Sequence, residues 1–135
     1  MTVVLTYGTF DILHVGHINL LRRARALGDR LVVGLSTDAF NALKRKQALQ
    51  DYASRKAVLE AIRFVDEVFP EACWQQKTED IHRYGADVFV MGDDWAGRFD
   101  YLAAYCRVIY LPRTEDISST ALKQTMGRQC AHQLV

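Results

Sequence analysis

Five short segments rich in apolar residues, each predicted to be a strand, alternate along this chain with segments of helical spacing, and this alternation constrains the fold more than any other feature. The runs occupy residues 3–7, 31–35, 65–69, 87–91 and 108–111. Apolar side chains at helical spacing lie between them, for example from Ile18 to Leu27 and over 77–84. Because the apolar runs have no polar face, they are expected to form a parallel sheet that is covered on both sides. The sequence therefore predicts an α/β fold with a doubly wound parallel sheet in a single domain.

Residues that interrupt regular structure predict the element boundaries. Ser54 is expected to cap the helix that precedes the third apolar run. Pro70 is expected to end that run, and Gly85 to end the helix over 77–84. A last helix is predicted to begin at Ser118 or Ser119, since a serine hydroxyl caps the start of a helix well.

Composition and charge narrow the range of partners. The chain has 135 residues, of which 50% are hydrophobic and 24% charged, and we expect one domain over 1–126 with a C-terminal tail over 127–135. A net charge of +1 without a basic block gives no support for binding nucleic acid. No apolar run is long enough for membrane insertion. Three irregularly spaced cysteines without a C-x-x-C pair favour a cytoplasmic protein without a disulfide framework.

In a doubly wound sheet, ligands bind beyond the carboxyl ends of the strands, where the strand order reverses. The segments that follow the first, fourth and fifth apolar runs are residues 8–17, 92–98 and 112–120. We therefore expect these three segments to form the ligand site.

The first of these segments has the residues of a phosphate-binding loop. Gly8 allows close approach of the backbone to a ligand, and Gly16 and His17 lie at a helix start, where unpaired amides and the helix dipole favour an anion. His14 and His17 are three residues apart, so both rings can donate hydrogen bonds to one phosphate. They could instead face solvent or form a zinc pair, but no third histidine or cysteine falls at ligand spacing, and no metal site is predicted.

The last segment carries hydroxyl groups at a predicted helix start. Ser119, Thr120 and nearby amides could hold distal phosphates while Arg113 neutralises charge, although one hydroxyl would also suit a simple helix cap.

Two further groups of charged residues are candidates. Lys44 and Lys46 belong to a basic stretch that would suit either a solvated face or an anion. Asp93 and Asp94 follow Gly92 at a strand end, where they could cap a turn, bind magnesium through water, or accept hydrogen bonds from a ribose or base.

Four strings together resemble the cytidylyltransferase family, in particular its glycerol phosphate branch. They are GTFDILHVGH at 8–17, RFVDEV at 63–68, VMGDDW at 90–95 and LPRTEDISST at 111–120. The H-x-G-H motif alone is shared by a wider nucleotidyltransferase superfamily, whereas the later strings narrow the resemblance. It runs from about Val4 to Lys123.

The resemblance implies a Rossmann-like sheet, a homodimer, and the use of CTP with Mg²⁺. It implies transfer of a cytidylyl group to sn-glycerol 3-phosphate, giving CDP-glycerol and pyrophosphate, for teichoic acid or a related surface polymer. Phosphoethanolamine or phosphocholine as acceptor, ATP as donor, or a non-catalytic nucleotide-binding module are the alternatives.

The resemblance also assigns roles to residues of this chain. The catalytic set is His14, His17, Lys46 and Arg113. The nucleotide-binding set is Thr9, Phe10, His14, Val15, Gly16, His17, Lys46, Asp94, Arg113, Thr114, Glu115, Asp116, Ile117, Ser118, Ser119 and Thr120, with Trp95 beside the cytidine. The acceptor set is Asp11, Lys44, Arg63, Asp66 and Lys77, of which the two lysines would bind the acceptor phosphate.

Two positions depart from the family pattern. Val15 stands where the relatives have tryptophan, at a position that is expected to pack. Asp116 stands where they often have glycine, and aspartate tolerates a left-handed turn conformation at modest cost.

Overall fold

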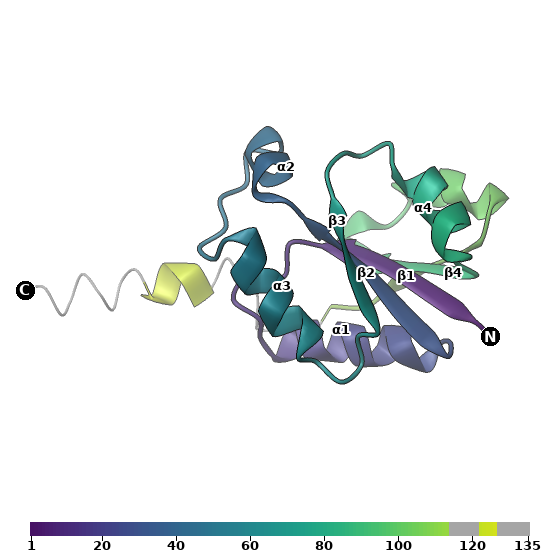
Figure 1. Cartoon of the computed structure of the whole chain (residues 1–135), viewed down its shortest axis with the longest axis horizontal. Coiled ribbons are helices and arrows are strands. Elements are labelled where there is room, and N and C mark those ends of the chain that lie inside the picture. Colours follow the sequence, from purple (N-terminus) through teal and green to yellow (C-terminus); the bar gives the residue numbers. More distant parts are fainter. Residues whose placement is uncertain (114–121, 127–135) are drawn as a thin grey trace, which may run out of the picture.

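The computed structural model describes residues 1–113 and 122–126 and contains one five-stranded parallel sheet, with strand order β3-β2-β1-β4-β5 (Figure 1). The strands are β1 (Val3–Gly8), β2 (Arg30–Ser36), β3 (Glu67–Glu71), β4 (Val88–Gly92) and β5 (Arg107–Leu111). The predicted doubly wound α/β fold is confirmed. The strand order reverses between β1 and β4, since β2 and β3 extend the sheet to one side and β4 and β5 to the other.

Helices cover both faces of this sheet. They are α1 (Val15–Ala26), α2 (Asp38–Leu43), α3 (Tyr52–Glu60) and α4 (Lys77–Tyr84), with short 3₁₀ helices η1 (Asp93–Trp95) and η2 (Asp100–Ala104). Residues 122–126 are also helical. In Figure 1, α1 and α3 lie on one side of the sheet and α4 on the other.

The core consists of two apolar layers, one on each face of the sheet. Leu21 of α1 and Leu59 of α3 pack on one face, whereas Ile81 of α4 and Leu102 of η2 pack on the other. Three of these four side chains are fully buried, and burying a leucine stabilises the fold by about 1.5–3 kcal/mol. The three central strands β1, β2 and β4 thus bury both of their faces, as the sequence predicts, whereas the edge strands β3 and β5 are only partly buried.

Two of the predicted boundaries are wrong, and one is confirmed. Asp51, not Ser54, caps α3, because its carboxylate accepts a hydrogen bond from the Ser54 amide at 2.8 Å. Pro70 lies inside β3 rather than after it, which is possible because β3 is an edge strand. Gly85 ends α4 as predicted, in the left-handed conformation with φ 62°.

At the amino edge of the sheet, carboxylates bind the backbone amides at strand starts. The amides of Thr2 and Leu31 each donate a 2.7 Å hydrogen bond, the first to Asp29 and the second to Asp66. The amide of Val3 donates to Asp87 at 2.9 Å. These bonds satisfy backbone donors at the amino edge of the sheet.

Within residues 1–113 and 122–126, no helix combines the length and apolar character required to cross a bilayer.

Candidate functional site

A pocket of about 310 Å³ opens at the carboxyl ends of β1 and β4, where the strand order reverses. Predicted nucleotide-binding residues on its wall are Thr9, Phe10, His14, Gly16, His17, Lys46, Asp94 and Arg113. Sequence reasoning missed Tyr7, Leu20, Met91 and Lys123, which also line it. Segments 8–17 and 92–98 therefore meet as expected, together with the first two residues of 112–120.

The loop after β1 holds two residues in an unusual backbone conformation. Phe10 has φ 49° and Ile12 has φ 50°, which is rare for residues with bulky or β-branched side chains. A Cβ atom at Gly8 would lie 2.8 Å from the Phe10 ring, so glycine there makes room for this ring as much as for a ligand. Strained backbone of this kind persists where the surrounding structure enforces it, and it occurs often at ligand sites.

Both histidines of this loop cap helix α1. The Gly16 amide donates to His14 Nδ1 at 3.0 Å, and the His14 amide donates to His17 Nδ1 at 3.2 Å. The two rings stack with their centroids 3.9 Å apart. Because each Nδ1 accepts a hydrogen bond from the backbone, each neutral ring carries its proton on Nε2. The pair therefore presents Nε2–H donors, the tautomer that hydrogen bonding to a phosphate requires.

The local environment keeps these rings neutral. Burial, together with neighbouring His14, lowers the pKa of His17 to about 4. Burial and the Arg113 guanidinium also lower the pKa of His14. At pH 7 the histidines are therefore neutral donors, not the stronger protonated donors that the sequence allowed.

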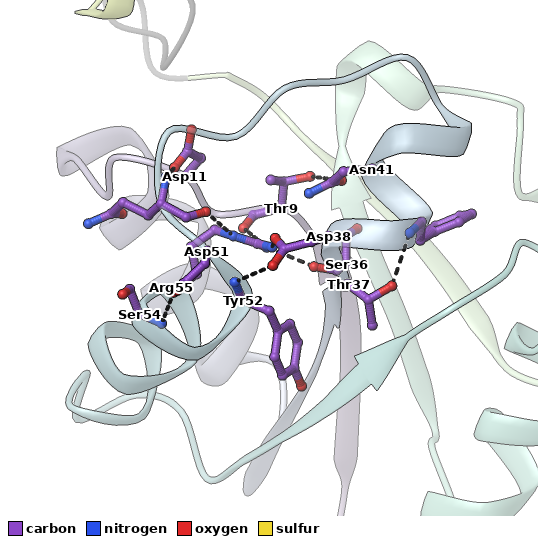
Figure 2. Close-up of polar contacts among 12 residues, drawn as sticks. Thr9, Asp11, Ser36, Thr37, Asp38, Asn41, Asp51, Tyr52, Ser54 and Arg55 are labelled. Atoms are coloured by element: carbon purple, nitrogen blue, oxygen red, sulfur yellow. Dashed lines mark hydrogen bonds and ion pairs between the residues drawn. The ribbon is translucent and has the colours of Figure 1, made fainter.

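Arg55 of α3 links the loop to the end of β2 and to the start of α2 (Figure 2). Its Nη1 donates to the carbonyl oxygens of Thr9 at 3.0 Å and Ser36 at 2.7 Å, and its Nη2 forms a 2.7 Å ion pair with Asp38. Sequence reasoning missed this fully buried arginine. The available signal was its position four residues before Leu59, on the buried face of α3.

Asp11 joins the loop to the segment after α2. Its carboxylate accepts hydrogen bonds from the amides of Leu49 at 2.7 Å and Gln50 at 3.0 Å, and it pairs with Lys123 at 2.6 Å. Burial alone would raise the pKa of Asp11, but Lys123 and the two amides outweigh burial and hold the pKa below its usual value. Asp11 thus lies on the pocket wall as an organising residue, with its carboxylate bound by the protein itself.

The lysine involved, Lys123, belongs to the short helix over 122–126. It is 23% exposed, and its Nζ also donates to the Gln47 carbonyl at 3.2 Å. No local sequence pattern singles out this residue, since its partners lie more than 70 positions earlier.

Thr9 and Asn41 form a buried polar pair beside the loop (Figure 2). The Thr9 hydroxyl donates to Asn41 Oδ1 at 3.0 Å. Within the described part of the chain, Asn41 Nδ2 is buried without a hydrogen-bond partner. Such a group costs about 1–3 kcal/mol, and donors of this kind are kept in native folds for a reason other than stability.

The outer wall of the pocket carries opposite charges. Arg113 Nη1 lies 3.5 Å from Asp94 Oδ2, and both side chains are more than half exposed. An exposed pair of this kind contributes about 0–1 kcal/mol, so either group can turn toward a ligand at little cost. Partial desolvation and then Lys123 lower the pKa of Lys46, which lies on the same wall.

The two lysines predicted to bind the acceptor phosphate meet beside this pocket. Lys77 Nζ lies 2.6 Å from Glu71 Oε2, the Ser36 hydroxyl donates to Glu71 Oε1 at 2.9 Å, and Lys44 Nζ donates to Ser36 Oγ at 3.0 Å. We call these four residues the lysine cluster. Lys77 is only 1% exposed and is paired with Glu71, which the sequence did not single out. Burial lowers the pKa of Lys44 to about 8, partly offset by Glu71.

Two predicted acceptor residues lie elsewhere. Asp66 accepts a hydrogen bond from Leu31 at the start of β2 and pairs with Arg25 at 3.2 Å. Arg63 is exposed and lies over the Phe64 ring, before β3 begins. Because this is the amino edge of the sheet and the pocket is at the carboxyl edge, neither residue lines the pocket of its own chain, contrary to the prediction that both shape it.

The expectation that Val15 packs is also wrong. Its side chain is 55% exposed at the first position of α1 and lies outside the pocket wall. The departure from the family pattern at Val15 therefore lies on the surface of α1 and changes no part of the core.

The remaining predicted residues, Thr114, Glu115, Asp116, Ile117, Ser118, Ser119 and Thr120, lie outside the described residues, as does the tail over 127–135. Among the residues that the structure describes, no three histidine, cysteine, aspartate or glutamate side chains gather as a metal site.

A strand-order reversal, a strained loop on a helix start and a pair of Nε2–H donors together define a nucleotide-binding α/β protein. The cytidylyltransferase-like family model matches residues 5–125. The chain belongs to this family.

Curated relatives cover nearly the whole chain. Glycerol-3-phosphate cytidylyltransferase of Bacillus subtilis (strain 168) is 60% identical over 127 residues, which are 94% of this chain and 98% of the relative. The Staphylococcus aureus (strain NCTC 8325 / PS 47) protein of the same name is 57% identical over 93% of this chain and 96% of its own length.

Among solved structures, a lipopolysaccharide core biosynthesis protein from Thermoplasma volcanium GSS1 matches with a TM-score of 0.72. It is 24% identical, over 85% of this chain and 99% of that one, and supports the fold alone.

Proposed function

We propose that this chain transfers a cytidylyl group from CTP to sn-glycerol 3-phosphate, giving CDP-glycerol and pyrophosphate. The observation that carries the proposal is the stacked pair His14 and His17, which lines the pocket at the start of α1 and carries its ring protons on Nε2. Relatives that are 57% and 60% identical bear the name of this activity.

In the proposed reaction, a phosphate oxygen of the acceptor attacks the α-phosphorus of CTP. A new phosphorus–oxygen bond forms as the bond to the β,γ-pyrophosphate breaks, and the pyrophosphate leaves with the electron pair. The acceptor phosphate is largely dianionic at pH 7, because its second pKa is about 6, so the enzyme needs no general base. Catalysis then consists of aligning two anions and stabilising the charge on the leaving group.

The side chains on the pocket suit this task. His14 and His17 donate hydrogen bonds to the phosphates, and burial, which lowers the pKa of both rings, favours the neutral donor form. Lys46 and Arg113 add positive charge, while Asp94 and Trp95 form the wall proposed for the cytidine. Donors that are fixed before the reaction lower its barrier because they need no reorganisation.

We propose that Mg²⁺ enters with CTP. The donor set fits this arrangement: Asp93 offers a carboxylate on the pocket wall, whereas Asp11 is already paired with Lys123 and Asp94 is assigned to the cytidine. Mg²⁺ is commonly held by one or two carboxylates together with substrate phosphates. When bound, it would neutralise charge on the triphosphate.

A substrate panel tests the proposed function. Pyrophosphate release is measured with CTP, ATP, GTP and UTP, each in the presence of glycerol 3-phosphate, phosphoethanolamine or phosphocholine and Mg²⁺. We expect turnover with CTP and glycerol 3-phosphate to exceed every other combination. Pyrophosphate release with ATP but not with CTP would contradict the nucleotide assignment. Tight CTP binding by calorimetry without any pyrophosphate release would instead identify a non-catalytic nucleotide-binding module.

We further propose a cytoplasmic homodimer whose CDP-glycerol serves teichoic acid or a related surface polymer. The dimer is supported by the family resemblance and by the exposed apolar residues Leu43 and Leu49, which are 78% and 61% exposed. Light scattering coupled to size-exclusion chromatography tests it, and a particle of about 15.4 kDa, the mass of one chain, would contradict it.

A further inference from the structure

The lysine cluster lies against aromatic rings that have the geometry of a cation-binding cage. Lys77 Nζ is 4.6 Å from the Tyr7 ring centroid, 4.9 Å from that of Trp74 and 5.3 Å from that of Phe99. Aromatic faces at such distances attract cations, and cages of this type are how proteins recognise quaternary ammonium ligands. In this chain, however, the ammonium in the cage is the protein's own.

Lys44, the other lysine of the cluster, lies over a neighbouring part of the same aromatic surface. Lys44 Nζ is 4.4 Å from the Phe40 ring centroid and 5.5 Å from that of Trp74. Phe40 and Trp74 also contact each other edge to face, with centroids 5.2 Å apart. The four aromatic residues around the cluster therefore face internal ammonium groups.

The cluster adjoins the nucleotide pocket. Tyr7, which contacts Lys77, lines that pocket, and so does Trp95, whose ring centroid is 6.0 Å from that of Trp74. Trp74 is 41% exposed, so an acceptor beside the triphosphate can reach this wall.

The charges in the cluster do not cancel. Lys44 and Lys77 each carry one positive charge, and Glu71 carries one negative charge, which leaves one net positive charge. Arg55 and Lys46 add positive charge nearby, because both influence the pKa of Lys44. Asp80, a carboxylate beside Tyr7, accepts hydrogen bonds from the Tyr7 hydroxyl at 2.6 Å and from Gln76 at 2.8 Å.

We propose that the lysine cluster is the acceptor-specificity device of this enzyme, which rejects phosphate monoesters that carry an ammonium group and admits those of an uncharged polyol. The two internal ammonium groups occupy the aromatic faces that a choline or ethanolamine head group would need, and they repel its charge. This is specificity by exclusion of the wrong ligand as well as by attraction of the right one. The inference rests on the proposed function.

The test compares acceptors in CDP-product formation with CTP and Mg²⁺. The measured quantity is kcat/KM for phosphoethanolamine divided by kcat/KM for glycerol 3-phosphate. Any general loss of phosphate binding or of folded protein lowers both values and cancels in this ratio. We expect the wild-type ratio to be far below one, and Lys44→Met to raise it at least tenfold.

Two further variants sharpen the test. Lys77→Met should raise the ratio as well, whereas Glu71→Gln should lower it, because it removes the only carboxylate of the cluster. Variants that merely damaged the structure would not move the ratio in opposite directions. Lys56→Met is the matched control, since it removes one lysine charge from α3 on the other face of the sheet.

A Lys44→Met ratio within twofold of the wild-type and Lys56→Met values overturns the inference while leaving the proposed function intact. So does a wild-type enzyme that uses phosphocholine as well as glycerol 3-phosphate. If Lys77→Met fails to fold, the half-buried Lys44 still decides the outcome. Absence of any CDP product from the wild type with every acceptor overturns the proposed function itself.

Discussion

At the amino edge of the parallel sheet, carboxylates accept hydrogen bonds from strand-start amides, whereas at the carboxyl edge the pocket wall carries imidazole, ammonium and guanidinium groups. The contrast follows from the direction of the strands. Backbone amides left unpaired at the strand starts need acceptors, while the helix starts that follow the carboxyl ends favour anionic ligands. The carboxylates at the amino edge thus serve the fold, whereas the charged groups at the carboxyl edge line the pocket, although motifs from both edges resemble the same family.

The largest expected effect comes from the histidine pair at the carboxyl edge. His14→Ala or His17→Ala should lower kcat by a factor of about 10² to 10³, since each change removes one donor to a phosphate that carries reaction charge. Steady-state kinetics measure the loss, and a thermal melt should show a folded protein. His82→Ala, which changes an exposed histidine on α4, is the matched control. Wild-type turnover in either loop variant would count against the site.

A change of pH is expected to have a smaller effect, on the KM for glycerol 3-phosphate. Burial lowers the pKa of Lys44 to about 8, so its ammonium group is charged at pH 7 and mostly neutral at pH 9. The charged form is the one that attracts phosphate, and KM for glycerol 3-phosphate should therefore rise about tenfold between these values. Glu71 opposes this loss, and Lys46, Lys77 and Arg55 promote it.

Lys44→Arg provides the control for this rise, because arginine stays charged over the whole range. Its KM for the acceptor should change little from pH 7 to 9. A wild-type KM for CTP that rose as much as the KM for glycerol 3-phosphate would break the assignment of Lys44 to the acceptor.

The smallest effect on activity is expected at the amino edge. Asp66→Ala removes the acceptor of the Leu31 amide and the partner of Arg25, and should lower the free energy of unfolding by about 1–3 kcal/mol. The value of kcat/KM should stay unchanged, since the Asp66 carboxylate lies at the amino edge of the sheet and the pocket at the carboxyl edge. Urea unfolding and steady-state kinetics on the same preparation test both halves. A raised KM for the acceptor at unchanged stability would instead return Asp66 to the acceptor site.

Local patterns were sufficient to predict the alternation of strands and helices and the position of the first loop. The loop over 8–17 directly follows an apolar strand and opens a helix, and such a junction lies at the carboxyl edge of a parallel sheet in any arrangement of the remaining strands. The termination of α4 at Gly85 was predictable for the same reason, because a left-handed helix end depends on neighbouring residues alone.

For two of the wrong predictions, at Pro70 and Asp66, a long-range position decided the outcome. Pro70 is tolerated inside β3 because that strand lies at the edge of the sheet, and an edge is a property of strand order. Asp66 shares a family motif with a predicted acceptor role, but its place before β3 puts it at the amino edge.

Short-range periodicity and contiguous motifs are enough to establish the fold class, the family and the loop on which the histidine pair lies. Three features of the site depend on the folded chain: the histidines are neutral Nε2–H donors, Arg55 holds the Thr9 carbonyl from 46 residues away, and Glu71 pairs with Lys77 beneath aromatic rings. The physical reason is that burial, proton position and ion pairing depend on which distant groups share a low-dielectric interior, and spacing along the chain does not record that.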